Sequence, residues 1–369
     1  MWTAAAYRRR LWIILRKTEW LCGHIGEILD GIAAIDVPTV MLVSVENVNY
    51  RLYLAMEENP RVTIVKGEEP VFCLKAVKNP VEIANTKNAH IKEGVAMARL
   101  QMCLEEKLAA GETVSETDVG ELLVNFRKEQ EGYMEDSFAV IAAYGANAAM
   151  MHYHPTPENH AVLQRKGFLL LDTGGQYVDG TTDTTRTYAL GELTDEERRY
   201  YTYVLKANIG IARTVFMEGC SGANLDIMSR TQIWKYGLDY RCGTGHGVGF
   251  VGPIHEGPQS LRMTNHVPFQ PGMTITDEPG IYEEGLVGVR IENELLVVEH
   301  METKYGKFYA FQPFTYLPID TTPVVLELMN EEEISWLNDY HQMVYDTLSP
   351  RMTERERIWL KEKTKPLEK

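Results

Sequence analysis

The amino-acid sequence predicts an α+β fold, and three features support this class. Apolar residues recur at helical spacing over residues 91–102 and 115–126, and again in the long segment after Thr194. Residues 168–187 have the pattern of two strands joined by a Gly-rich connection. Residues 287–298 alternate as a further strand does. Helices mixed with antiparallel hairpins are typical of the α+β class.

The first 80 residues predict a small, separate part of the chain. The runs at 40–45 and 62–65 predict short strands, and residues 49–56 predict a helix. Asn79–Pro80 marks a boundary, because the residue before a proline is driven out of the helical region. The basic start contains only a five-residue apolar run at 11–15, too short for a signal-peptide core. We expect an amphipathic helix or a poorly ordered terminus there.

The helix signals are stronger from residue 81 onward. Gly111 is a plausible helix stop, and Ser115 opens a second helix. Thr194 and Glu197 form a capping-box pattern at the start of a long helix. The remaining predicted elements are strands at 137–144, 273–276 and 287–298, a helix at 224–236, and helical structure from residue 331 onward.

Composition narrows the classes of partner and compartment. The chain has 369 residues and a net charge of -15, which argues against binding to nucleic acid or to an anionic membrane. No stretch approaches the ~18 apolar residues of a membrane span. The five cysteines are scattered and include no CxxC pair, so we expect no disulfide framework and a reducing, cytoplasmic location.

Two aspartates in the central hairpin are the first candidate metal ligands. Asp172 ends an apolar strand, and Asp183 lies in the Thr-rich strand that follows. Aspartate is a poor strand former, so its presence in both strands needs a reason. With a turn near residues 177–180, the two carboxylates are expected to face each other across antiparallel strands. Directly opposed Cβ atoms lie about 4.5–5.5 Å apart, and two carboxylates at that distance repel unless a proton or a cation lies between them.

Three residues farther along the chain extend the set. His246 lies in GTGHGVG, Glu278 follows the strand run MTIT, and Glu292 lies in VGVRIENELLVV with Arg290 predicted on the same strand face. Four carboxylates and one imidazole exceed what one tetrahedral zinc uses. They suit two divalent ions such as Mn²⁺, Co²⁺, Zn²⁺ or Fe²⁺, and such a pair activates water for hydrolysis.

Each of these residues is ordinary when taken alone. A single Asp after an apolar run is most often a turn or cap residue, and a Glu in a strand usually faces solvent. GTGHGVG lacks the Lys-Ser/Thr of a phosphate loop and the GxGxxG spacing, and neither HExxH nor GxSxG occurs. His152 and His255 are candidate proton carriers, although spacing does not distinguish His152 from His154.

The ordered set of motifs resembles a known family. The segments LLDTGGQY, DGTTDTTRT, GTGHGVG, HEGP, TDEPGIY and VRIENELLVV are similar to those of the pita-bread metallopeptidases, and within them to the aminopeptidase P (Xaa-Pro aminopeptidase) branch. The resemblance runs from about Val81 to the C-terminus. The last segment is similar to the C-terminal extension of the cytosolic, three-domain subtype.

That resemblance implies a role for each candidate residue. Two metal ions, with Mn²⁺ as the usual metal of this branch, are implied at a ligand set of Asp172, Asp183, His246, Glu278 and Glu292. Glu278 is also the implied general base toward the water that bridges the ions. His152 and His255 are implied to bind substrate and assist proton transfer, with Arg290 and Tyr282 as supporting residues beside substrate and ligands. This match favours His152 over His154.

The resemblance also implies a domain plan. Residues 1–80 are expected to be a partial creatinase-like N-terminal domain, 81–310 the pita-bread catalytic domain and 311–369 a C-terminal extension. Three-domain relatives carry two such N-terminal domains, and we expect the first to have no counterpart here. Cys242 stands where a histidine is expected before GTGHG, and Gly252–Pro253 is unusual in the loop before His255. Neither change removes a predicted ligand.

The expected function is that of an Xaa-Pro aminopeptidase. Its substrate is a peptide with proline at the second position, and the family resemblance implies a homodimer. One alternative is a prolidase, which has the same ligands and takes only X-Pro dipeptides. A second alternative is a metal-free pita-bread module that binds peptides or histones, although such modules have typically lost the ligands.

Overall fold

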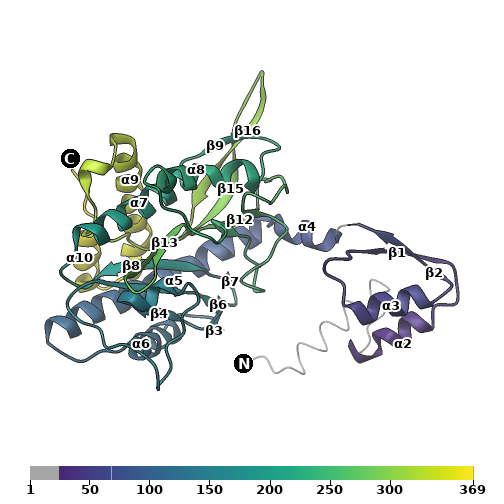
Figure 1. Ribbon diagram of the computed structural model, residues 1–369, viewed down its shortest axis with the longest axis horizontal. Coiled ribbons are helices and arrows are strands. Elements are labelled where there is room, and N and C mark those ends of the chain that lie inside the picture. Colours follow the sequence, from purple (N-terminus) through teal and green to yellow (C-terminus); the bar gives the residue numbers. More distant parts are fainter. Residues whose placement is uncertain (1–24, 68, 369) are drawn as a thin grey trace. The chain divides into compact units, whose positions relative to one another are not determined.

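The computed structural model of the chain describes residues 25–67 and 69–368. The chain divides into two compact units, Met1–Val71 and Phe72–Lys369 (Figure 1). Helix α4 (Pro70–Ala76) begins in the first unit and ends in the second. The helix or poorly ordered terminus expected at the start of the chain lies outside the described residues.

The smaller unit contains a β-α-β arrangement. Strands β1 (Thr39–Val43) and β2 (Val62–Lys66) pair in parallel, and helix α3 (Tyr50–Glu58) connects them. The predictions at 40–45, 49–56 and 62–65 are therefore confirmed. Buried Ile32, Val43 and Met56 form the centre of a small core. The unit's other described elements are η1 (Ile25–Glu27) and α2 (Ile28–Ala33).

Two helices open the larger unit. Helix α5 (Pro80–Ala109) starts at the predicted boundary, where the Asn79 side chain caps it and Glu82 completes a capping box. Helix α6 (Glu116–Lys128) starts with the same device, built from Ser115 and Asp118. Both predicted helices are confirmed, and α5 is much longer than the periodic run that predicted it.

The central hairpin belongs to a three-stranded antiparallel sheet, β4-β5-β8. Its strands are β4 (Ile141–Tyr144), β5 (Phe168–Thr173) and β8 (Thr184–Ala189). The antiparallel arrangement is confirmed, but the direct opposition of the two aspartates is wrong. Asp172 pairs with Thr185, and Asp183 comes just before β8. The pairing of Tyr177 with Gly180 places the turn at residues 178–179, beyond the midpoint between the two aspartates.

A second small sheet lies within the same stretch of chain. It has the order β3-β6-β7. The strand predicted at 137–144 is confirmed only over its second half, because β4 begins at Ile141, and β3 ends at Asp136, before the predicted strand begins. The short helix η2 (Gly145–Ala149) follows β4. The strands of this sheet are β3 (Tyr133–Asp136), β6 (Gly175–Tyr177) and β7 (Gly180–Thr181).

The order of two helices followed by antiparallel strands occurs again after residue 194. Helix α7 (Asp195–Ala212) begins with the predicted capping box of Thr194 and Glu197. Helix α8 (Gly222–Trp234) matches the prediction at 224–236 within two residues. A four-stranded sheet follows in the order β12-β15-β16-β9, with strands β9 (Val215–Met217), β12 (Thr274–Asp277), β15 (Asn293–Thr303) and β16 (Gly306–Pro313).

The single strand predicted at 287–298 is wrong. Strand β14 (Val287–Arg290) pairs with β13 (Gly280–Glu283), whereas β15 joins the four-stranded sheet. The chain changes sheets at Ile291–Glu292 because the backbone groups there bond elsewhere. The Glu292 N–H donates to the Thr185 carbonyl at 3.1 Å, and the Asn208 amide donates to the Ile291 carbonyl at 3.3 Å.

The C-terminal helices complete the core of the larger unit. Helix α9 (Glu331–Leu348) confirms the helical prediction from residue 331 and buries Leu337, Val344 and Leu348 in the main apolar cluster. Figure 1 shows α9 and α10 beside one another, and the β15–β16 hairpin projecting from the body. The remaining elements are η3 (Leu326–Leu328), η4 (Ser349–Arg351), α10 (Glu354–Lys363), β10 (Gly245–His246) and β11 (Ser260–Leu261).

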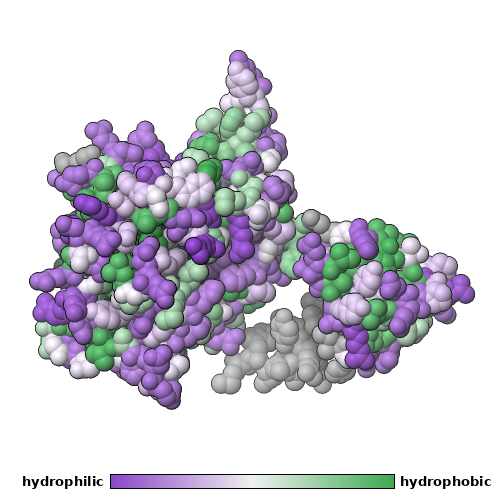
Figure 2. All heavy atoms as spheres, viewed as in Figure 1, coloured by the Kyte–Doolittle hydropathy of each residue, from purple (hydrophilic) through white to green (hydrophobic). Residues whose placement is uncertain are grey.

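The expectations from composition concern the surface, the cysteines and the helices of the described chain. The face of the larger unit seen in Figure 2 is mostly hydrophilic, with scattered apolar residues. Among the described residues, Cys73, Cys103, Cys220 and Cys242 are free thiols. No helix in the described part of the chain has the length and apolar character needed to cross a bilayer.

Candidate metal centre

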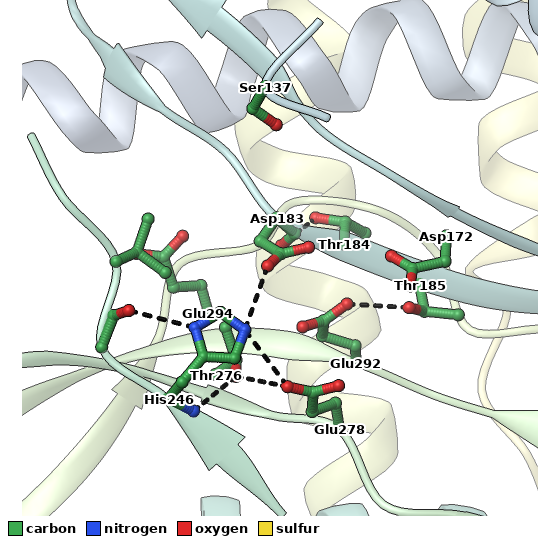
Figure 3. A network of polar contacts seen from close by, with 12 residues as sticks. Ser137, Asp172, Asp183, Thr184, Thr185, His246, Thr276, Glu278, Glu292 and Glu294 are labelled. Atoms are coloured by element: carbon green, nitrogen blue, oxygen red, sulfur yellow. Dashed lines mark hydrogen bonds and ion pairs between the residues drawn. The ribbon is translucent and has the colours of Figure 1, made fainter. Parts of the chain in front are cut away.

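Residues from both halves of the larger unit line a pocket of about 250 Å³. Figure 3 shows the carboxylates of Asp172, Asp183, Glu278 and Glu292 directed toward a shared space beside His246. Glu292 is buried against this group, with 1% of its surface exposed. Eight of the nine predicted site residues line the pocket itself, namely His152, Asp172, Asp183, His246, His255, Glu278, Tyr282 and Arg290.

His246 is the centre of the cluster. Its Nε2 lies 3.4 Å from Asp183 Oδ2 and 3.3 Å from Glu278 Oε1. Its Nδ1 lies 3.0 Å from the Gly247 carbonyl oxygen, which can only accept, so Nδ1 carries the proton. Nε2 is therefore the ring nitrogen that can bind a cation once it gives up its own proton. Ligand atoms of Asp183, His246 and Glu292 all lie within 4.8 Å of one another.

The backbone around His246 is fixed by close packing on β12. A Cβ at Gly245 would lie 1.8 Å from the Thr276 carbonyl oxygen, so only glycine allows this approach. The Thr276 hydroxyl accepts from the His246 N–H at 3.0 Å and donates to Glu278 Oε1, also at 3.0 Å. One threonine thereby orients two candidate ligands.

Thr185 plays the corresponding part on the other side of the cluster. Its hydroxyl donates to Glu292 Oε2 at 2.8 Å and accepts from Arg290 Nε at 3.2 Å. Arg290 and Glu292 therefore contact the same hydroxyl. They do so although they are not in one strand as predicted, because β14 ends at Arg290. Arg290 also donates to Asp172 Oδ2 at 2.5 Å and to the Tyr282 hydroxyl at 2.7 Å.

The pKa values of three carboxyl groups in the cluster are raised, because several negative charges are buried close together. Burial raises the pKa of Asp183 to about 7, and the charge of Asp172 adds to the shift. Burial likewise raises the pKa of Glu278, and it raises that of Glu292 well above its usual range. Burial alone would lower the pKa of His246, but the hydrogen bond with Asp183 and the charge of Glu278 outweigh it and raise the value to about 9.

This donor set fits divalent cations. Asp172 Oδ1 is buried without a hydrogen-bond partner among the described residues, although Oδ2 is bonded. Burying carboxylates together is costly unless charge of opposite sign compensates them. Carboxylate oxygens with one imidazole nitrogen are the ligands that hard and borderline divalent ions accept. The side chains therefore provide both the charge and the atoms that such ions require.

Three histidines lie toward the solvent side of the pocket. His152, His154 and His255 all line it and are exposed. The His255 ring is 4.2 Å from the His246 ring and nearly perpendicular to it, at 85°. Burial and the charges of His246 and His152 lower the pKa of His255, so the ring is neutral at pH 7. Placement does not separate His152 from His154, because both line the pocket.

Thr185, Thr276 and Arg186 orient the site, and the sequence reasoning missed them. In β8, Thr185 alternates with Arg186, whose guanidinium is buried on the opposite face. Arg186 donates to the Glu292 carbonyl at 2.5 Å and to the Leu317 and Pro318 carbonyls at 2.8 and 3.0 Å. The sequence did contain one signal, an arginine inside a Thr-rich strand. An arginine is rarely buried without partners, so one in a buried strand indicates that other segments pack around it and accept its hydrogen bonds.

Comparison with known proteins identifies the family. The model of metallopeptidase family M24 matches residues 84–299, and that of the C-terminal region of peptidase M24 matches 307–367. The chain belongs to metallopeptidase family M24. The M24 match covers every candidate ligand named above.

Individual relatives show which M24 enzymes the chain is similar to. Aminopeptidase P2 of Arabidopsis thaliana is 41% identical over 309 residues, which cover 82% of this chain and 43% of that protein. The structure of the X-prolyl aminopeptidase of Caenorhabditis elegans is described as that of a cytosolic enzyme with a di-nuclear active site. It is 32% identical to this chain and matches it with a TM-score of 0.88, over 96% of this chain and 59% of that one. The Xaa-Pro dipeptidase of Bacillus anthracis is 28% identical with a TM-score of 0.64, covering 80% and 79%.

These matches confirm the pita-bread fold and the predicted resemblance to the aminopeptidase P branch. The chain spans about half the length of the curated relatives it matches.

Proposed function

We propose that this chain is a dinuclear metal-dependent aminopeptidase that cleaves the bond before proline and releases the N-terminal residue of the peptide. The observation that carries the proposal is the convergence of four carboxylates and His246 at one pocket, in a chain that belongs to M24. The similarity to aminopeptidase P2 and to the C. elegans X-prolyl aminopeptidase supports the choice of reaction.

We assign the metal ligands to Asp172, Asp183, His246, Glu278 and Glu292, with Mn²⁺ as the expected ion and Co²⁺, Zn²⁺ or Fe²⁺ as alternatives. A bound pair of divalent ions supplies polarisation of the scissile carbonyl and a nucleophile at neutral pH. The buried carboxylate cluster and the direction of His246 Nε2 toward it support this assignment.

The remaining site residues bind the peptide and carry protons. Glu278 is the proposed general base, and its raised pKa makes it a better proton acceptor than an ordinary carboxylate. We assign that proton to Oε2, because Oε1 already accepts from Thr276. His152 and His255 lie at the exposed end of the pocket, where a neutral ring can donate to a peptide carbonyl. Arg290, bonded to both Asp172 and Tyr282, holds this ligand and the tyrosine beside the substrate.

Further parts of the proposal concern organisation. We propose the division 1–80, 81–310 and 311–369, a homodimer, and a cytoplasmic location. The match at 307–367 supports a distinct C-terminal region. Free thiols in the described chain and the cytosolic description of the C. elegans enzyme support the compartment. The dimer is supported by family resemblance alone.

A prolidase is the alternative within the same chemistry, and the B. anthracis dipeptidase supports it. The higher TM-score to the X-prolyl aminopeptidase, 0.88 against 0.64, favours the aminopeptidase. A non-catalytic peptide-binding module is disfavoured because all five ligand side chains are present and lie together.

A peptide assay tests the proposal. The metal-loaded chain is incubated with Ala-Pro-Pro and, separately, with Ala-Pro, and free alanine is measured. We expect release from the tripeptide, with Asp183→Asn as the inactive control. Release from the dipeptide only would establish the prolidase instead. No turnover of either peptide by folded protein with Mn²⁺, Co²⁺ or Zn²⁺ would contradict both.

A further inference from the structure

A second depression, of about 590 Å³, adjoins the metal pocket. The two share Ala139 and His154, so the boundary between them lies at the pocket's histidine side. This groove, called the α6 groove below, follows one face of helix α6 and the segments that pack on it. Its lining includes Glu121, Val124, Lys128, Asp136, Val140 and Pro155.

The metal pocket has one buried end and one end that is open to solvent. At one end Arg290 is 3% exposed and holds Asp172, so this end is closed. At the other end His152, His154 and His255 are exposed. An enzyme that removes a single N-terminal residue must hold that residue at the closed end. The rest of the peptide then leaves past the histidines, where the α6 groove begins.

We propose that the peptide residues beyond the proline bind in the α6 groove, and that this groove selects peptides with a cationic side chain there. The inference rests on the proposed function, since it extends the same site. A groove of this size accommodates several peptide atoms beyond the metal pocket. Apolar Val124, Val140 and Pro155 provide contact surface between the charged groups.

Negative charge dominates the lining. Glu121 is exposed and forms no ion pair with any residue the structure describes, whereas Lys128 is the single lysine of the lining. Asp136 shares Arg127 with Glu93, so that group of three keeps one net negative charge.

Glu116, which is fully buried, adds a further negative charge beneath the floor of the groove. It accepts hydrogen bonds only from neutral groups, among them the backbone N–H of Tyr144 and of Ala161, at 2.6 and 2.7 Å. A Lys or Arg side chain on the peptide is therefore attracted by the negative potential of the groove, and an acidic one is repelled.

The experiment compares Ala-Pro-Gly-Lys-Gly with Ala-Pro-Gly-Glu-Gly on the Mn²⁺-loaded chain. We expect kcat/KM for the lysine peptide to be about three- to tenfold higher at low salt, as for partly exposed charge pairs, and the ratio to fall toward one at high salt. Glu121→Lys should abolish or invert the preference. Glu302→Lys, at an exposed position in β15, changes the net charge equally and should leave the preference intact.

A steric test is independent of charge. Val124→Trp fills the groove and should raise KM for both pentapeptides while leaving Ala-Pro-Gly unchanged, because the tripeptide ends near the boundary. Pentapeptides cleaved equally well by all variants would overturn the inference while leaving the proposed function intact. Hydrolysis of none of the peptides by the wild-type chain would overturn both.

Discussion

Arg290 donates a hydrogen bond of 2.5 Å to Asp172 Oδ2, and both side chains are largely withdrawn from solvent. This contact compensates one carboxylate of the cluster with a fixed positive charge and leaves Asp172 Oδ1 for another partner. Asp183, Glu278 and Glu292 have no arginine or lysine in ion-pair contact within the described chain, and burial raises the pKa of each. In the proposed centre, these are the charges that bound divalent ions would balance.

Asp183→Asn should separate metal binding from folding. The substitution removes one charge from a repulsive cluster, so the metal-free variant should unfold at the same temperature as wild type or higher. Wild type should gain thermal stability with Mn²⁺, because a ligand that binds only the folded state stabilises it, and the variant should gain little. Calorimetry with and without Mn²⁺ measures both effects. An equal Mn²⁺ gain in the variant would remove Asp183 from the ligand set.

Thr185→Val tests the hydroxyl that joins Arg290 to Glu292. Valine keeps the shape but leaves Glu292 Oε2 and Arg290 Nε each without this partner. Loss of such a supporting contact typically lowers metal affinity about 10–100-fold, and we expect that range by Mn²⁺ titration calorimetry. Thr202→Val, which removes a buried hydroxyl bonded to the Arg198 carbonyl in α7, is the matched control and should leave the affinity unchanged. Equal affinities in both variants would contradict this role.

Arg186→Met should destabilise the larger unit. Arg186 is fully buried, and its guanidinium joins the Glu292 carbonyl to the C-terminal segment through Leu317, Pro318 and the Tyr340 hydroxyl. Removing the guanidinium leaves these buried acceptors without a partner, which costs about 1–3 kcal/mol for each group left unpaired, measurable by urea unfolding.

Arg355→Met is the control for Arg186→Met, because it removes an arginine whose ion pair with Glu106 is solvent-exposed. It should change the free energy of unfolding by less than about 0.5 kcal/mol. The partial replacement Arg186→Lys keeps the charge without the planar fork, and it should lie between wild type and Arg186→Met. An Arg186→Met variant as stable as wild type would refute the account of this network.

Local sequence signals predicted much of this fold. Capping residues marked the starts of α6 and α7, and the Asn79–Pro80 boundary marked that of α5, because these signals depend only on residues within one turn. The identity of the candidate ligands followed from residue type and order along the chain. Their exact pairing did not, since a turn at residues 178–179 lies beyond the midpoint of the two aspartates and places Thr185, not Asp183, opposite Asp172.

Long-range contacts account for what the sequence left open. The run at 287–298 alternates throughout, yet it changes sheets at Glu292 because Thr185 and Arg186, more than 100 positions earlier, bind its backbone. The same cause hid the orienting residues. A threonine or arginine in a strand shows its role only when the segments it joins are placed together.

His341 should make stability pH-dependent. Burial and the charge of Arg186 lower its pKa from 6.5 to about 4, and its Nε2 accepts from the Ile319 N–H at 3.1 Å. The unfolded chain therefore binds a proton that the folded chain excludes between about pH 6.5 and pH 4, and the free energy of unfolding falls as the pH is lowered through that window. At pH 5 the loss from this residue is about 2 kcal/mol.

His341→Gln isolates that contribution, because the glutamine oxygen can still accept from Ile319. Urea unfolding at pH 7.5 and pH 5.0 should show a smaller loss in the variant, by about 2 kcal/mol. All other titrating groups are shared by the two proteins and cancel in the difference. The same loss in both would show that His341 binds its proton equally in the folded and unfolded states.

The central claim is that Asp172, Asp183, His246, Glu278 and Glu292 hold two metal ions at one site. Anomalous X-ray diffraction from crystals of the Mn²⁺-loaded chain tests it most directly, because the signal locates manganese itself. The account predicts two anomalous peaks, about 3.5–4 Å apart, within coordination distance of those five side chains. A fully ordered cluster without manganese peaks, in crystals grown with excess Mn²⁺, would contradict it.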